Sequence, residues 1–323
     1  MPRQARLDSP GTLHHVIIRG LERGAIVRDD VDRAAFVTRL GDVSRTTGTA
    51  IYAWALLPNH AHFLLRSGPS GLPPFMRRFL TGYAVTFNHR HGRIGYLFQN
   101  RYKSIVCEED TYFQELVRYI HLNPLRAGQV DSLHALERYP WCGHAAVLGH
   151  RPQPWHDRRG VLGWFGASER AAVRRYRLFV REGIPLGRRP DLVGGGLVRS
   201  AGGWAAVRSR RRRKEPTLGD PRILGSGDFV ARLFREAAAR HAASLRRAVT
   251  SQEIDAILRA NCIRYHVEMA ELQQGGRRGA LSRVRAEIAH ELVVRRGVSL
   301  ATAARHLGVS TTAVSKILRK VDG

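Results

Sequence analysis

Two apolar runs separated by a Pro-Asn turn place the strongest constraint on the fold of this chain. The first run covers residues 50–57, and the second covers residues 60–66. Strand-like runs joined by so short a turn are typical of an antiparallel hairpin. Alternate side chains of a strand point to the same face, so His60 and His62 share a face. We therefore expect their imidazoles to reach one point at the start of the second strand.

Strand-like and helix-like segments alternate through the first 150 residues in the order β-α-β-β-α-β-α. Because the hairpin is antiparallel, this order predicts an α+β fold with an antiparallel sheet flanked by helices, rather than a doubly wound sheet. Thr111 and Gln114 have the spacing of a capping box at the start of the last helix, and Pro124 ends it. The expected strands are residues 13–19, 50–57, 60–66 and 102–107, and the expected helices are residues 30–44, 72–90 and 111–123.

The charge of the chain indicates a polyanionic partner. Lys and Arg number 53 against 27 Asp and Glu, which gives a net charge of +26 and a pI near 11.4. Such a field attracts nucleic acid and makes binding sensitive to salt. No apolar run approaches the length of a membrane span, and the first residues show no signal peptide. We therefore expect a DNA partner, no membrane partner and a cytoplasmic location, which the three scattered cysteines also favour.

Composition divides the chain into three expected parts. Residues 1–148 contain the alternating segments, residues 149–227 form a connector rich in Gly, Pro and Arg, and residues 228–323 read as an all-α DNA-binding domain. The connector contains a basic run whose side chains are candidate DNA contacts: Arg210, Arg211, Arg212 and Arg213.

A helix-turn-helix is expected near residues 299–320. Ala304, Gly308 and Val314 have the spacing of a small residue at the helix contact, a glycine in the turn and an apolar residue on the second helix. The alternative is an ordinary helical hairpin. The second helix would expose four candidate groove and phosphate contacts: Thr312, Ser315, Lys316 and Arg319.

Tyr119 and Asn123 are one helical turn apart and are candidates for a nucleophile and an oxygen ligand. Two imidazoles leave most positions around a divalent metal empty, so a further oxygen ligand is expected. A metal-polarised phosphate would activate the phenol, which is otherwise a poor nucleophile. Each residue also has a plainer interpretation, since tyrosines often flank amphipathic helices and asparagine often ends a helix before proline.

Four sequence blocks resemble the REP-associated tyrosine transposases, relatives of the single-tyrosine HUH transposases. The blocks are HHVIIRG at 14–20, WALLPNHAHFLL at 54–65, GYLFQNRYKS at 95–104 and RYIHLNPLRAG at 118–128. The resemblance implies that His60 and His62 bind Mg²⁺ or Mn²⁺, that Tyr119 is the nucleophile, and that Asn123 stands where related enzymes have a glutamine ligand. Arg101 and Lys103, in the third block, are candidate phosphate contacts.

The resemblance also implies a mechanism. The enzyme would cut single-stranded DNA near hairpin-forming repeats through a covalent 5′-phosphotyrosine, as a monomer or a homodimer in the nucleoid of a bacterial cytoplasm. The alternative function is a non-catalytic DNA-binding regulator derived from a transposase. RNA binding has no aromatic sequence block to support it.

Overall fold

The computed structural model describes residues 7–187, 189–193, 219–247, 251–273, 279–296 and 298–321. Internal contacts divide the chain into two compact units, residues 1–237 and residues 238–323. This division differs from the three parts expected from composition, whose boundaries remain predictions. Each unit is described by itself below.

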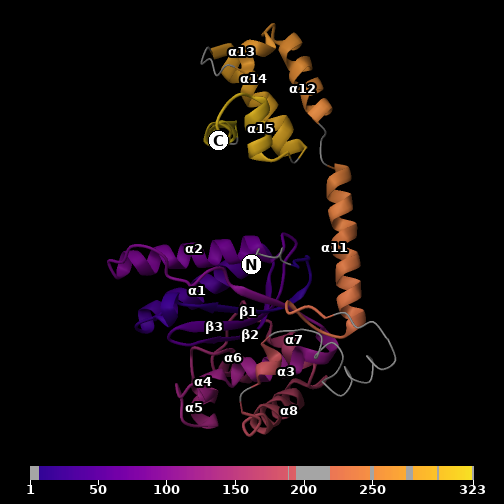
Figure 1. The fold of residues 1–323 in the computed structure, drawn as a ribbon. Coiled ribbons are helices and arrows are strands. Elements are labelled where there is room, and N and C mark those ends of the chain that lie inside the picture. Colours follow the sequence, from indigo (N-terminus) through magenta and orange to yellow (C-terminus); the bar gives the residue numbers. More distant parts are fainter. Residues whose placement is uncertain are drawn as a thin grey trace. The chain divides into compact units, whose positions relative to one another are not determined.

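A five-stranded sheet forms the centre of the first unit, in the order β2-β3-β1-β4-β5 (Figure 1). The first four strands pair antiparallel, and the short β5 pairs parallel with β4. The strands are β1 (Leu13–Arg19), β2 (Ala50–Leu56), β3 (His60–Arg66), β4 (Lys103–Cys107) and β5 (Ile223–Leu224). The expected α+β fold with its hairpin is confirmed, whereas the two-residue β5 gave no strand signal in the sequence.

The sheet has an apolar core on each face, because nearly every strand position is buried. Val16, Phe63 and Leu65 belong to one core, which packs against α1 (Asp30–Thr47) and α2 (Leu72–Arg90). Leu64 and Ile105 belong to the other core, which packs against α3 (Glu109–His121). Figure 1 shows the sheet between these two helical layers. Since alternate residues face opposite layers, the register decides which histidines reach which core.

The α2 helix follows the sequence prediction closely. Two prolines occupy its first turn, where the missing N–H groups would have no helical partner. Phe75, Phe79, Tyr83 and Phe87 recur every four residues and are all buried against the sheet. This aromatic stripe fixes α2 on the face opposite α3.

The start of α3 differs from the sequence prediction. The helix begins at Glu109, two residues before the expected capping box. Instead of capping, the Gln114 amide donates a hydrogen bond to the carbonyl oxygen of Trp164. A contact with a distant segment therefore takes the Gln114 side chain, which the local pattern predicted to cap the start of the helix. After α3, the one-turn α4 (Asn123–Arg126) follows Leu122, whose φ and ψ are in the right-handed helical region.

Residues after 148 are more ordered than the connector expected from their composition. The helices α7 (Arg158–Gly163) and α8 (Glu169–Glu182) bury Val161, Ala172 and Tyr176 in the core below α3. The basic residues of this stretch alternate with an apolar face that packs into the core, and the boundaries of the expected connector remain predictions. The remaining elements of the first unit are α5 (Leu133–Arg138), α6 (Gly143–Leu148) and the 3₁₀ turns η1 (Leu21–Arg23) and η2 (Pro190–Leu192).

The outer strand β2, and β4 on the other side of the antiparallel strands, are hydrogen-bonded to other parts of the same chain. On β2, the carbonyl oxygen of Ile51 accepts from the Asp157 amide, and the Leu56 amide donates to the carbonyl of Trp141. On the other side, the amide of Val106 donates to the carbonyl oxygen of Arg222, next to β5. The chain then continues into α11 (Gly227–Arg247), whose start is held by Glu108 through hydrogen bonds to Ser226.

The second unit is helical in its described part. Its core contains apolar side chains from every helix, including Leu258, Leu272, Ile288 and Val314. The elements are α12 (Ser251–Arg264), α13 (Met269–Gln273), α14 (Gly279–Ala289), the π-helical turn η3 (His290–Arg295), α15 (Leu300–His306) and α16 (Thr311–Val321).

The segment expected to be a helix-turn-helix contains two helices separated by a glycine turn. The Ser299 hydroxyl accepts from the amide of Thr302 at the start of α15, and the Ser310 hydroxyl accepts from the amide of Ala313 at the start of α16. Gly308 lies between them with φ +64°. The helices agree with the prediction, and DNA reading by this segment remains a prediction.

No helix in the described residues combines the length and the apolar character that crossing a bilayer requires.

Candidate functional site

A cavity of about 480 Å³ lies in the first unit, between the β1–β3 pair and the end of α3. Its polar lining comes from segments that are far apart in the sequence: Arg19, His60, His62, Tyr119, Asn123, Arg126 and Arg189. Three side chains that the sequence analysis combined into one site, His60, His62 and Tyr119, are therefore brought together. Their chemical roles remain predictions.

The register of β3 aims both histidines at this cavity. In the β1–β3 pair, His60 lies opposite Arg19 and His62 lies opposite Ile17. The two imidazole rings have their centroids 5.2 Å apart. His60 is partly exposed, whereas His62 is 5% exposed. One imidazole is thus at the mouth of the cavity and the other is deeper in the protein.

Both histidines are neutral at neutral pH. Burial lowers the pKa of His60 to about 4, and the positive charge of Arg19 acts in the same direction. Burial also lowers the pKa of His62 well below its usual value, with smaller contributions from His15 and His60. A neutral imidazole keeps one ring nitrogen with a free lone pair. The site therefore offers nitrogen ligands without an acidic proton to displace.

Tyr119 lies on the last turn of α3, with its ring edge-on to the histidines. Its ring centroid is 5.8 Å from that of His62 and 5.9 Å from that of His15. Burial raises the pKa of the phenol, although the Arg126 charge and a hydrogen bond with Asn123 act in the opposite direction. The phenol is therefore protonated at neutral pH, and it needs an activated electrophile before it can attack.

Asn123 begins α4, and its side chain bonds back to the last turn of α3. Its amide nitrogen donates a hydrogen bond of 3.1 Å to the carbonyl oxygen of Tyr119. The expected helix end at Asn123 is wrong, because α3 already ends at His121 and Asn123 is the first residue of α4, whose first turn accommodates Pro124. The amide oxygen is not used by that bond, and the residue lines the cavity. Its role as a metal ligand remains a prediction.

Arg126 was missed by the sequence analysis. Its Cζ atom lies 5.7 Å from the centroid of the Tyr119 ring, and its Nη2 donates to the carbonyl oxygen of Gly183. Its Nε and Nη1 are buried and have no hydrogen-bond partner within the described part of the chain. Buried donors without acceptors are rare in folded proteins. An anionic oxygen in the cavity would satisfy them. Tyr119, Asn123 and Arg126 follow the i, i+4, i+7 spacing of one helix face, which could have pointed to this arginine.

His15 is a second residue that the sequence analysis did not assign to the site. It is fully buried on β1, and its Nε2 lies 3.1 Å from Nδ1 of His62. Its own Nδ1 lies 3.1 Å from the carbonyl oxygen of Leu192. No sequence spacing could have found this contact, because it depends on the register between β1 and β3 and on a turn 177 residues away.

The donor set fits a divalent cation with incomplete protein coordination. Within the described ranges, no group of three or more His, Cys, Asp and Glu side chains is placed to hold a metal. His60 and His62 would supply two nitrogen ligands, and the amide oxygen of Asn123 could supply a third atom. Such a site leaves positions for water and phosphate oxygens, as a metal that binds its substrate requires.

The predicted DNA contacts near the sheet lie in two places. Lys103 donates a hydrogen bond of 2.6 Å to the carbonyl oxygen of Val193, a residue that lines the cavity. Arg101 is exposed and borders a different, mostly apolar groove beside α2. Only Lys103 is therefore close to the candidate site.

The other predicted DNA contacts lie toward the end of the chain. Thr312 and Lys316 are exposed on α16, and Ser315 is partly exposed. The side chain of Arg319 and the run Arg210, Arg211, Arg212 and Arg213 lie outside the described residues.

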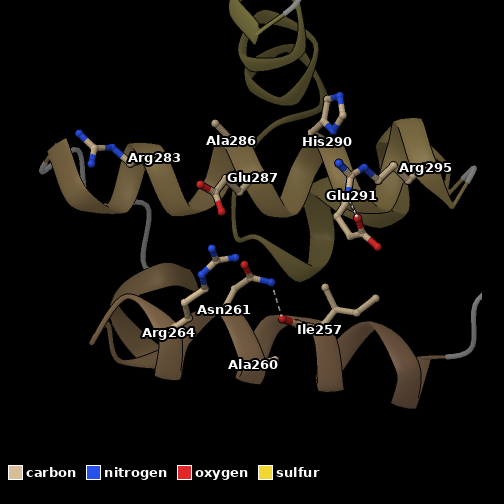
Figure 2. Close-up of a pocket in the computed structure, with 10 residues that line it drawn as sticks. All are labelled: Ile257, Ala260, Asn261, Arg264, Arg283, Ala286, Glu287, His290, Glu291 and Arg295. Atoms are coloured by element: carbon tan, nitrogen blue, oxygen red, sulfur yellow. Dashed lines mark hydrogen bonds and ion pairs between the residues drawn. The ribbon is translucent and has the colours of Figure 1, made fainter.

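A second cavity, of about 680 Å³, lies in the helical unit between α12 and the α14–η3 segment. Figure 2 shows Asn261 and Arg264 on α12 facing Glu287 and Glu291 across it. The Asn261 amide donates to the Ile257 carbonyl within α12, and Glu291 pairs with Arg295. Acidic and basic side chains alternate here, so this cavity offers no single charge to a ligand.

Comparison with known proteins finds a match for the part of the chain that contains His60, His62 and Tyr119. Residues 10–123 match the family described as "Transposase IS200 like". No curated protein sequence matches the chain.

Two solved structures are similar to part of the chain. One is described as a REP-associated tyrosine transposase bound to a REP hairpin. It is 18% identical, with a TM-score of 0.39, over 46% of this chain and 86% of that chain. The other, a candidate transposase from Deinococcus radiodurans, is 20% identical, with a TM-score of 0.27, over 35% and 92% of the two chains. At these values neither structure bears on the chemistry of the site.

Proposed function

We propose, starting from the match of residues 10–123 to the family of IS200-like transposases, that the protein is a metal-dependent DNA strand transferase. It cuts single-stranded DNA and holds the cut end on Tyr119 as a covalent 5′-phosphotyrosine. The observation that carries this proposal is the meeting of one tyrosine and two neutral histidines around one cavity.

In the cleavage step, the phenol oxygen of Tyr119 attacks the scissile phosphorus and a new O–P bond forms. The bond from phosphorus to the 3′ oxygen breaks, and its electron pair goes to that oxygen. The phenol gives up its proton, and the departing strand gains one as a 3′ hydroxyl group. A strand hydroxyl reverses these changes in the joining step, so the energy of the bond is kept and no nucleotide is consumed.

A divalent cation, Mg²⁺ or Mn²⁺, bound by His60 and His62 would polarise the phosphate and stabilise the charge that develops on its oxygens. The chain's own residues orient the reactants. The partly exposed Tyr119 is fixed at the end of α3 by the Asn123 amide. Arg126 presents two buried donors without partners beside the phenol. Arg19 and Arg189 also line the cavity. Together these cations suit a phosphate group more than a neutral substrate.

We propose hairpin-forming repeat DNA as the substrate, on the basis of the sequence resemblance. The net charge of +26 supports a nucleic-acid partner. The exposed side chains on α16 are proposed to contact duplex DNA beside the hairpin, as a second point of attachment.

A non-catalytic DNA-binding regulator is the second candidate. One observation favours it: burial raises the pKa of Tyr119, so the phenol is unreactive without a bound activator. The two candidates differ in whether a covalent adduct forms.

The test is incubation with labelled single-stranded hairpin DNA and Mg²⁺ or Mn²⁺, followed by denaturing electrophoresis. We expect a protein–DNA adduct that disappears in Tyr119→Phe and in the absence of metal. Tyr96→Phe is the matched control, because Tyr96 is 84% exposed and lies outside the cavity, and it should form adduct as the unmodified protein does. An adduct in Tyr119→Phe would refute the assignment of the nucleophile. DNA binding without any adduct would favour the regulator.

A further inference from the structure

We propose that two hydrogen-bonded relays, each starting at a backbone carbonyl, hold His60 and His62 in the same tautomer. In that tautomer Nδ1 carries the hydrogen and Nε2 carries the lone pair. His15 and Asn59 are the positioning residues of the relays. The inference deepens the proposed function, because it states how the chain prepares the nitrogen ligands for a divalent cation.

The first relay runs from Leu192 through His15 to His62. A carbonyl oxygen can only accept, so the hydrogen bond of 3.1 Å between Leu192 and His15 Nδ1 requires a hydrogen on that nitrogen. In a neutral ring, His15 Nε2 then has a lone pair. The 3.1 Å contact between this Nε2 and His62 Nδ1 needs one hydrogen, which His62 must supply. His62 is left with the lone pair on Nε2.

The second relay runs from Arg23 through Asn59 to His60. The Asn59 amide nitrogen donates to the carbonyl oxygen of Arg23 at 3.1 Å, which fixes the orientation of the amide. The amide oxygen then lies 2.7 Å from Nδ1 of His60 and can only accept. His60 must therefore donate from Nδ1, and its lone pair is also on Nε2.

The two relays use different residues, but both place the hydrogen on Nδ1 of the histidine at the cavity. Each relay begins at a main-chain carbonyl, which can only accept a hydrogen bond and therefore fixes the direction of every bond that follows. Arg23 is held in place by a turn in which Glu22 and Arg23 have φ of 52° and 63°. His15 is held by burial and by stacking on His62, with ring centroids 5.4 Å apart. A ligating histidine usually has its other ring nitrogen bonded to such a partner.

His15 could also serve only to fill the core. The neighbouring His14 is the comparison for that role, because it is buried on the same strand. His14 is also fully buried. Alternate residues of β1 face opposite sides of the sheet, and His14 lies opposite Leu65, which belongs to the core on the α1–α2 side. Its Nδ1 bonds to the Ser104 hydroxyl at 3.0 Å. The two adjacent histidines therefore share burial and strand, and only His15 contacts a cavity residue.

The first test measures the tautomers directly in the unmodified, metal-free full-length protein. Nitrogen-15 chemical shifts of the histidine rings distinguish a nitrogen that carries hydrogen from one that carries a lone pair. Assignment of the two spin systems uses His60→Ala and His62→Ala. We expect hydrogen on Nδ1 and a lone pair on Nε2 in both residues. Hydrogen on Nε2 of either residue at neutral pH would overturn the proposal, and this result does not depend on any folded variant of His15.

The second test measures affinity for Co²⁺, without DNA, by its visible absorption. Co²⁺ is the probe because it binds imidazole more tightly than Mn²⁺ does. Because other histidines of the chain can also bind Co²⁺, only the part of the Co²⁺ binding that is lost in His60→Ala is compared between variants. We expect His15→Leu to weaken that component about 10- to 100-fold. His15→Gln, whose amide oxygen can accept from His62, should restore it to within about threefold, and His14→Leu should leave it unchanged.

Two outcomes of the second test would contradict the relays. One is unchanged Co²⁺ affinity in folded His15→Leu, or equal weakening in His14→Leu. The other is the absence from the unmodified protein of any binding component that depends on His60. Failure of the proposed function looks different: Co²⁺ binds with the expected dependence on His15, yet no covalent DNA adduct forms with Mg²⁺ or Mn²⁺.

Discussion

Arg126 combines two buried, unpartnered guanidinium nitrogens with a position over the Tyr119 ring. If these donors serve a phosphate, Arg126→Gln should slow adduct formation by about 100-fold or more, the usual effect of removing one donor to a developing anion. The measurement is a single-turnover adduct assay with saturating DNA and metal.

The control for Arg126 is Arg45→Gln, because Arg45 is exposed and paired with Asp42 away from the cavity. That variant should react at the original rate. Equal slowing in both variants would indicate a general loss of DNA binding, and an unaffected rate in Arg126→Gln would refute the phosphate contact.

The sequence predicts the residues of the site only where one element presents them together. His60 and His62 could be paired because a strand has a period of two, and Tyr119 with Asn123 because a helix repeats after about four residues. Joining the two pairs required the family resemblance. His15 could not be assigned, because the hydrogen bond between His15 and His62 spans 47 residues and depends on strand register.

At the scale of elements, the turn between α15 and α16 depends on Gly308. Its φ of +64° disfavours any side chain, and a Cβ atom there would overlap the main-chain carbonyl of Gln273. We expect Gly308→Ala to destabilise the helical unit by about 2 kcal/mol or more. Hydrogen exchange of amides in α13 and α14 should accelerate accordingly.

The matched variant for Gly308 is Gly279→Ala, because a Cβ at Gly279 meets no atom within 4 Å and its φ is not in the left-handed region. Exchange in the helical unit should change little in this variant. If both variants behave alike, the close approach to Gln273 does not matter for stability.

Long periodic segments are the elements that the sequence predicts best. The α2 stripe and the β2–β3 hairpin lie where they were expected, because burial of a regular apolar pattern dominates their energy. The start of α3 differs from the prediction, and the short β5 was not predicted. In each case a contact with a distant segment decides the conformation, such as the hydrogen bond between Gln114 and Trp164.

At the scale of the whole molecule, buried neutral histidines outside the site link stability to pH. Burial lowers the pKa of His14 and His156 to about 4 and that of His144 to about 3. The unfolded chain takes up protons near pH 6.5, whereas the folded chain does not until lower pH. The contribution of these histidines to the free energy of unfolding is therefore complete above about pH 6.5. It falls on acidification by up to about 1.4 kcal/mol per pH unit for each histidine.

The check is urea unfolding at pH 8.5, 7.5 and 5, followed by tryptophan fluorescence, because all five tryptophans lie within residues 1–237. We expect similar midpoints at the two higher values and a clear decrease at pH 5. A urea midpoint that is higher at pH 5 than at pH 7.5 would contradict the conclusion that these rings are buried and uncharged.

The charge of the chain predicts how DNA affinity depends on salt. If Lys316 contacts a phosphate, Lys316→Gln should reduce the slope of log affinity against log salt concentration by about 1. Fluorescence anisotropy with duplex DNA at several salt concentrations measures that slope. Arg45→Gln again serves as the control, and an unchanged slope in Lys316→Gln would remove α16 from the DNA interface.

The hydrogen bonds at the two rims of the sheet limit how copies of this protein can associate. Main-chain groups of β2 already bond to residues 141 and 157, and those of β4 bond to the segment around β5. An incoming strand from another molecule finds few free groups to pair with. Along β2, the chain itself therefore occupies part of the edge at which two copies could join their sheets.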